Sequence, residues 1–282
     1  MSRIVLVHGI AQQFKGPDSL LAEWLPSLRD GVTLAKGTPP TADEVAAAFY
    51  GDLFRPAGRG IGEPDLDASD IVDPFDVELL VSWWQAAALE DPAVPGLDAD
   101  TRVRTPRIAQ RALNALGHSA SFAHVADRAM VSDLRQVRRY LAEPELRSSV
   151  LRRVEACVTE QTRILIGHSL GSVVAYEALC ANPQWPVEAF ISLGSPLGLR
   201  GLIFERLRPA PVSGRGAWPG GIRSWTNIAD RGDAVAGEKH LAGLFGPGVV
   251  DVPVHNGSHA HDIRPYLSAR ETGEAVVAAA GG

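Results

Sequence analysis

The residues best suited to chemistry are a serine between two glycines and a group of aspartates and histidines near the end of the chain. The serine is Ser169, within Gly-His-Ser-Leu-Gly at 167–171. An aliphatic run at 164–166 precedes this stretch and apolar residues at helical spacing follow it, which predicts a strand, a sharp turn and a helix. A serine on such a turn projects its hydroxyl out of the sheet. The pattern therefore predicts a nucleophile elbow with Ser169 as nucleophile, the alternative being a structural helix cap.

A serine nucleophile needs help from two further groups. A base must remove its proton as it attacks, and backbone N–H groups must stabilise the negative oxygen that forms. The N–H of Leu170, at the start of the predicted helix, is one expected donor. The other is expected from Ile10, because Gly9 lets the loop after the first strand turn close to the serine. His8 in that loop is expected to be a structural hydrogen-bonding residue rather than the base.

Strands that alternate with helices must position these groups. Such alternation predicts an α/β fold, with a mostly parallel sheet covered by helices on both faces. A parallel sheet presents its chemistry at the carboxyl ends of its strands. The runs that predict strands lie at 4–7, 48–53 and 164–166, and within 189–197, 222–236 and 248–255.

A helical stretch from about 75 to 143 interrupts the alternation. It contains segments near 76–91, 106–116 and 123–141. A crossover between parallel strands needs only a dozen or so residues, so this stretch predicts a helical lid or cap. Trp83 and Trp84 within it are expected to pack the lid onto the body, or alternatively to line an apolar acyl pocket.

The composition fits a globular chain and disfavours some partners. The 282 residues are 45% hydrophobic and 21% charged, with a net charge of −6. Neither nucleic acid nor an anionic membrane would attract such a chain. No apolar run is long enough to span a bilayer, and the first residues do not resemble a signal peptide, so a cytoplasmic location is expected. Cys157 and Cys180 are expected to be buried free thiols.

Five stretches together resemble the α/β-hydrolase superfamily, and most of all its lipase and esterase-like branch, which includes proteins similar to GPI-inositol deacylase. The stretches are "IVLVHGI", "YGDLF", "ILIGHSLGSVVAYEAL", "ISLGSPL" and "WTNIADRGDAVA". The resemblance covers most of the chain except the helical insertion. It implies one domain over 1–282 and catalytic residues in the order serine, acid, histidine. Because His8 and Gly9 follow the first strand, two leading antiparallel strands are missing, which leaves a sheet of about six strands.

The resemblance also indicates where the acid and the base should lie. The family's Asp-x-Val element matches Asp233, while Asp230, at the expected strand end, is the alternate. The histidine before a Tyr-Leu pair in "HDIRPYL" is His261, with His259 as its alternate and His255 less favoured.

A metal site was weighed against this triad, since the three histidines and Asp262 crowd together. One loop rarely supplies ligands that converge tetrahedrally, and no metal is expected.

These parts lead to a functional expectation. Ser169, His261 and Asp233 would hydrolyse a carboxylic ester through an acyl-enzyme, with no cofactor and with a small, apolar acyl substrate. The same triad would also serve a thioesterase, an amidase or peptidase, or an acyltransferase or cyclase. A protein of this fold that binds a ligand without turnover is a further alternative.

Overall fold

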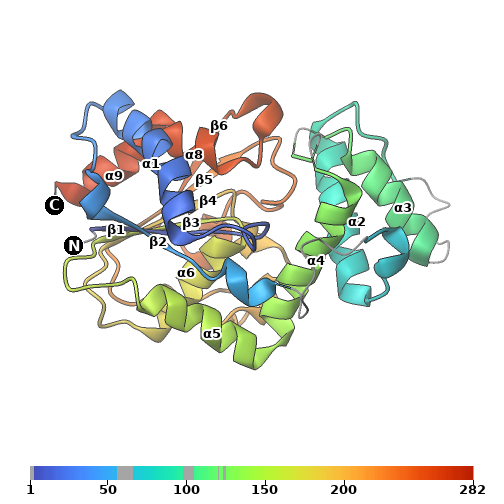
Figure 1. Ribbon diagram of the computed structural model, residues 1–282, viewed down its shortest axis with the longest axis horizontal. Helices are drawn as coiled ribbons and strands as arrows, with labels where there is room; N and C mark the ends of the chain where they lie inside the picture. Colours follow the sequence, from blue (N-terminus) through green and yellow to red (C-terminus); the bar gives the residue numbers. More distant parts are fainter. Residues whose placement is uncertain (1–2, 56–65, 98–104, 120, 123–124, 282) are drawn as a thin grey trace.

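A single parallel sheet forms the centre of the molecule (Figure 1). The computed structural model describes residues 3–55, 66–97, 105–119, 121–122 and 125–281, and these ranges contain six strands in the order β2-β1-β3-β4-β5-β6. The strands are β1 (Ile4–Val7), β2 (Val45–Ala48), β3 (Ile164–His168), β4 (Ala189–Leu193), β5 (Ser224–Asp230) and β6 (Val249–Val254). The predicted α/β fold with a sheet of about six strands is confirmed.

Both faces of the sheet are apolar and both are covered by helices. Successive side chains of a strand point to opposite faces, so Val5 and Val7 of β1 lie in one core while Ile4 and Leu6 lie in the other. Helices α5 and α6 cover the first core, and α1, α8 and α9 cover the second. None of the helices that the structure describes is both long and apolar enough to cross a membrane. The helices outside the insertion are α1 (Pro17–Leu34), α5 (Pro144–Glu155), α6 (Leu170–Ala181), α7 (Ala242–Phe245), α8 (Ile263–Ser268) and α9 (Arg270–Ala280).

Three helices between β2 and α5 form the insertion. They are α2 (Pro74–Glu90), α3 (Thr105–Leu116) and α4 (Asp127–Ala142). Figure 1 shows α2 and α3 to one side of the sheet, beyond the carboxyl ends of its strands, with α4 leading back toward α5. Residues 123–124, where the third helical segment was expected to begin, lie outside the described residues.

The second strand lies earlier than the sequence pattern indicated. It was expected near 48–53, but β2 ends at Ala48 and a 3₁₀ turn follows at Gly51–Phe54. The strand ends opposite the end of its neighbour β1, where Val7 pairs with Ala48, and beyond that point the N–H of Tyr50 donates to Nε2 of His8 at 3.0 Å. Tyr50 and Phe54 still enter the core, and this explains the apolar pattern that was mistaken for a strand.

A buried charged network holds α6 against its neighbours. Glu177 of α6 accepts hydrogen bonds from both Nε and Nη2 of Arg147 in α5, the first at 2.8 Å. The hydroxyl of Tyr140, in α4, donates to the same carboxylate at 2.6 Å. Arg147 also donates to the carbonyl of Arg206, at 2.9 Å. Because Arg147 and Glu177 are only 2% and 1% exposed, each charge depends on the other.

Replacing the cation of this network should destabilise the fold. Arg147→Met would leave a buried carboxylate without its ion partner, so we expect the free energy of unfolding to fall by about 3–5 kcal/mol in urea titrations. Arg153→Met is the control, because Arg153 is 47% exposed and pairs with Asp52 at 3.0 Å. Its loss should stay below about 1 kcal/mol. Equal losses in the two variants would show that the buried network does not stabilise α6.

Candidate active site

Ser169 occupies a strained corner between β3 and α6. Its backbone has φ +52° and ψ −132°, in a region that residues with a Cβ rarely adopt. A Cβ added to Gly171 would overlap the carbonyl groups of Val7 and His8, and one added to Gly167 would meet the backbone of the turn itself. The strand, turn and helix predicted around the serine are therefore confirmed, along with the need for both glycines.

The corner lies at the point where the order of the strands reverses. The chain leaves β1 for β2 on one side, and β3 pairs with β1 on the other. Ligands of open parallel sheets bind in the crevice at such a point. The loop after β1 approaches the serine closely there, because a Cβ on Gly9 would lie 2.7 Å from Cβ of Ser169. The N–H groups of Ile10 and Leu170, the two predicted oxyanion donors, donate to no backbone group of the described residues.

His8 braces this loop. Its Nδ1 donates to the carbonyl of Gly9 at 2.6 Å, its Nε2 accepts the N–H of Tyr50, and its ring stacks on that of Tyr50 with 3.9 Å between centroids. The hydroxyl of Tyr50 also donates to the carbonyl of His8. Burial lowers the pKa of His8 to about 4. With both ring nitrogens engaged, His8 has the structural role predicted for it.

A carboxylate and an imidazole meet on the opposite side of the corner. Oδ2 of Asp233 accepts a hydrogen bond from Nδ1 of His261 at 2.8 Å, and Oδ1 accepts the N–H groups of Val235 and Ala236 at 3.0 and 3.2 Å. Burial by itself would raise the pKa of Asp233. The positive charge of His261 and the hydrogen bonds from His261 and Tyr266 outweigh burial and hold that pKa below its ordinary value. Asp233 is therefore an anion at neutral pH.

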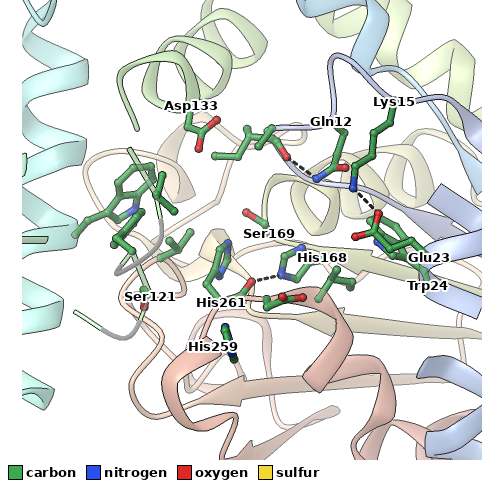
Figure 2. Close-up of a pocket in the computed structure, with 18 of the residues that line it drawn as sticks. Gln12, Lys15, Glu23, Trp24, Ser121, Asp133, His168, Ser169, His259 and His261 are labelled. Carbon is green, nitrogen blue, oxygen red and sulfur yellow. Dashed lines mark hydrogen bonds and ion pairs between the residues drawn. The ribbon is translucent and has the colours of Figure 1, made fainter. Parts of the chain in front are cut away.

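This contact determines which nitrogen of His261 is basic. Since Nδ1 carries the proton that Asp233 accepts, the neutral form of the ring has its lone pair on Nε2. His261 and Ser169 line the same cavity, of about 300 Å³, and Figure 2 shows both side chains there. Nε2 is buried and has no hydrogen-bond partner, so it does not bond to the Ser169 hydroxyl in this structure. Such bonds are often long in free enzymes and tighten when substrate binds.

The alternates for acid and base have other surroundings. Asp230 accepts the N–H of Gly232 at 2.6 Å and that of Asn256, so it organises the turn after β5. His255, with a side chain 89% exposed, lies 3.8 Å from Asp230. His259 is exposed in a short 3₁₀ turn at the edge of the cavity. The structure thus brings Asp233 and His261 into a hydrogen bond beside the cavity, whereas His255 and Asp230 contact each other away from the residues that line it.

The residues weighed as metal ligands do not form a cluster. Asp262 caps α8 by accepting the N–H of Arg264 at 2.9 Å. Within the described part of the chain, no group of three histidine, cysteine or carboxylate side chains is arranged to hold a metal ion. Cys157 and Cys180 form no disulfide and are half-buried rather than fully buried.

Two residues that support the site were not predicted from the sequence. The buried hydroxyl of Tyr266 donates to Oδ2 of Asp233 at 2.8 Å and accepts the N–H of Asp230 at 2.8 Å. Oγ of Ser172 donates to the carbonyl of Ser169 at 2.6 Å, which holds the strained turn. Tyr266 belongs to the "HDIRPYL" stretch, which marked the histidine but gave no role to the tyrosine.

The insertion contacts both loops of the site. Oε1 of Gln136, in α4, accepts the N–H of Ala11 at 3.3 Å, directly after the predicted oxyanion residue. Ala11 has φ +63°, so this bond supports a strained residue. Oγ of Ser121 donates to the carbonyl of Gly232 at 3.0 Å and accepts the N–H of Ala234 at 2.9 Å, on either side of the acid. Helix α4 and the segment before it thus position groups on two sides of Ser169.

The paired tryptophans have different environments. Trp84 is buried and its Nε1 donates to the carbonyl of Pro95 at 2.6 Å, within the insertion. Trp83 is also buried and packs on Phe122, with 5.3 Å between ring centroids, but it lines the cavity as well. Both tryptophans are thus buried core residues; the hydrogen bond of Trp84 lies within the insertion, and Trp83 also lines the cavity.

A second histidine next to the serine is held neutral. Nε2 of His168 contacts the carbonyl of His261 at 3.0 Å, and the two rings lie 4.8 Å apart. Burial, followed by the charge of His261, lowers the pKa of His168 to about 3. The neutral ring donates to the backbone of His261 and so fixes the loop that carries it.

The lowered pKa of His168 predicts a loss of stability in acid. Between pH 6.5 and about pH 3 the unfolded chain binds a proton at this residue and the folded chain does not, so stability falls as the pH falls. From neutral pH to pH 5 the contribution is about 2 kcal/mol, at ~1.4 kcal/mol for each pH unit below 6.5. We expect His168→Gln to lose about that much less than the wild type between pH 7 and pH 5 in urea titrations. Equal losses would contradict a neutral His168.

No family model matches this chain, and neither a curated protein nor a solved structure matches it. The residues that the structure assembles are a serine on a strained corner, a loop that approaches it closely at Gly9, and an aspartate–histidine pair whose histidine lines the same cavity.

Proposed function

We propose that this protein is a serine hydrolase of the α/β-hydrolase type that cleaves carboxylic esters. The observation that carries the proposal is the bond between Asp233 and Nδ1 of His261, which leaves a basic Nε2 at the cavity that Ser169 lines. An aspartate bound to Nδ1 orients the imidazole and stabilises its protonated form. These are the properties that a serine nucleophile requires of its base.

The reaction proceeds in two halves. Nε2 of His261 accepts the proton of the Ser169 hydroxyl while Oγ attacks the acyl carbon, and the N–H groups of Ile10 and Leu170 stabilise the resulting oxyanion. The imidazolium then protonates the alkoxide as it leaves, and the acyl group stays on Oγ. Water, deprotonated by His261, attacks the acyl-enzyme and releases the carboxylic acid. The protein needs no cofactor for these steps.

An ester is the proposed substrate because an alkoxide leaves more readily than an amide nitrogen. A thioester or an amide fits the same groups, as does transfer of the acyl group to an acceptor other than water. Binding of a ligand without turnover is the alternative from a different class. A probe that reacts only with an activated serine separates this alternative from the enzymatic ones.

The proposal predicts that a fluorophosphonate probe labels the protein at Ser169 at neutral pH, and that Ser169→Ala abolishes labelling. Hydrolysis of p-nitrophenyl butyrate should fall by at least about 10³-fold in His261→Ala, because the base is lost. In His259→Ala it should change little. An unlabelled wild-type protein that hydrolyses no ester, thioester or amide of a test panel would favour the binding protein. Loss of activity in His259→Ala alone would make His259 the base.

The contact from the insertion to the oxyanion loop predicts a positioning role for Gln136. Gln136→Leu should lower kcat for p-nitrophenyl butyrate about tenfold with little change in KM, because the oxyanion forms only after substrate has bound. Gln110→Leu is the control, since Gln110 is exposed and bonds along α3 to Asn114, at 2.9 Å. A rise in KM at constant kcat in Gln136→Leu would assign this residue to substrate binding instead.

A further inference from the structure

Buried polar atoms without a partner gather around the cavity. Among the described residues five buried side-chain nitrogen or oxygen atoms have no hydrogen-bond partner, and three of these belong to residues that line the cavity: Nε2 of His261, Oε1 of Gln12 and Nε1 of Trp83. Unpaired buried polar groups are rare in folded proteins, and each calls for an explanation. The proposed proton transfer accounts for His261. It does not account for the indole N–H of Trp83.

The neighbouring tryptophan shows that the insertion can satisfy a buried indole. Trp84 is buried like Trp83, and its N–H reaches the carbonyl of Pro95 at 2.6 Å. Trp83 has the same chemistry one position earlier in α2 and lacks such a bond, although its ring is packed on Phe122 and is 2% exposed. An indole nitrogen is a donor only. The missing partner is therefore an acceptor.

The cavity is small, about 300 Å³, and its two sides differ. Figure 2 shows Lys15 and Glu23 on one side of Ser169, and Ser121, next to Phe122, on the other. The ion pair of Lys15 and Glu23 is 36% exposed, so that side opens to solvent. During the reaction the alcohol leaves the site while the acyl group stays on Ser169. We therefore assign the side open to solvent to the alcohol and the side of Trp83 to the acyl group.

We propose that Trp83 is a specificity residue whose indole N–H donates a hydrogen bond to an acceptor oxygen in the acyl chain. This inference rests on the proposed function and narrows its substrate class. The preferred substrates are short acyl esters that carry an ether, carbonyl or hydroxyl oxygen, in place of the plain apolar acyl group expected from the sequence. A hydrocarbon chain of the same length leaves the buried donor unpaired in the complex.

A set of isosteric esters tests this proposal. The esters are p-nitrophenyl hexanoate and three analogues in which an ether oxygen replaces the CH₂ at position 3, 4 or 5 of the chain. For each ester, kcat/KM is measured with the wild type and with Trp83→Phe. At one oxygen position, we expect the variant to lose about tenfold more activity than it loses with hexanoate, as one hydrogen bond of ordinary strength provides. Comparing the two proteins on the same ester cancels the effect of the oxygen on ester reactivity.

The matched control is Trp84→Phe, which removes an indole N–H already bonded within the insertion and should change all four esters equally. If Trp83→Phe does not fold, wild-type kcat/KM divided by the hydroxide-catalysed rate of each ester replaces it, and this ratio should rise about tenfold at one oxygen position. A flat profile across the esters that the wild type hydrolyses would overturn the role of Trp83 and leave the esterase intact. A wild type that hydrolyses none of them and resists the fluorophosphonate would overturn the proposed function itself.

Discussion

The strained backbone at Ser169 is the feature on which the rest of the site depends. A non-glycine residue at φ +52° costs of order 1–3 kcal/mol and persists only where its surroundings enforce it. Hydrogen bonds fix both backbone groups of Ser169. Its N–H donates to the carbonyl of Leu193 at 3.0 Å, and its carbonyl accepts the hydroxyl of Ser172. Strand β3, which lies in the middle of the sheet, leads into the corner. Helix α6, which follows the corner, is buried on nearly all sides. The hydroxyl is thus positioned by the most deeply packed elements of the fold.

A helix buried in this way cannot carry a charge without a partner. Glu177, in the interior of α6, has one in Arg147, and the hydroxyl of Tyr140 completes the network. Because Tyr140 lies in α4, the network joins the elbow helix to the insertion. The same α4 carries Gln136 to the oxyanion loop, and the segment before it carries Ser121 to the acid loop. The insertion therefore helps to position two loops of the candidate site as well as bordering the cavity.

The sequence allowed prediction of features encoded over short distances. The glycines around Ser169, the aliphatic strand before it and the helix after it are neighbours in the sequence, so the residue pattern was enough to predict the turn at Ser169. Asp233 and His261 were favoured through resemblance, and only the structure shows them in contact. Contacts between distant positions were missed, such as Gln136 with Ala11 and Tyr266 with both aspartates. The second strand was misplaced for the same reason, since beyond Ala48 the N–H of Tyr50 bonds to a side chain 42 positions away.

Three histidines near Ser169 have different roles because their surroundings differ. His8 and His168 are buried with backbone groups as partners, and burial lowers the pKa of each, so both stay neutral at physiological pH. A backbone carbonyl has no net charge to offset the desolvation of an imidazolium, whereas an ionised carboxylate has. Of the three, only His261 has such a carboxylate, Asp233, within hydrogen-bond distance. The imidazole that is bonded to a carboxylate is therefore the one that lines the cavity together with Ser169.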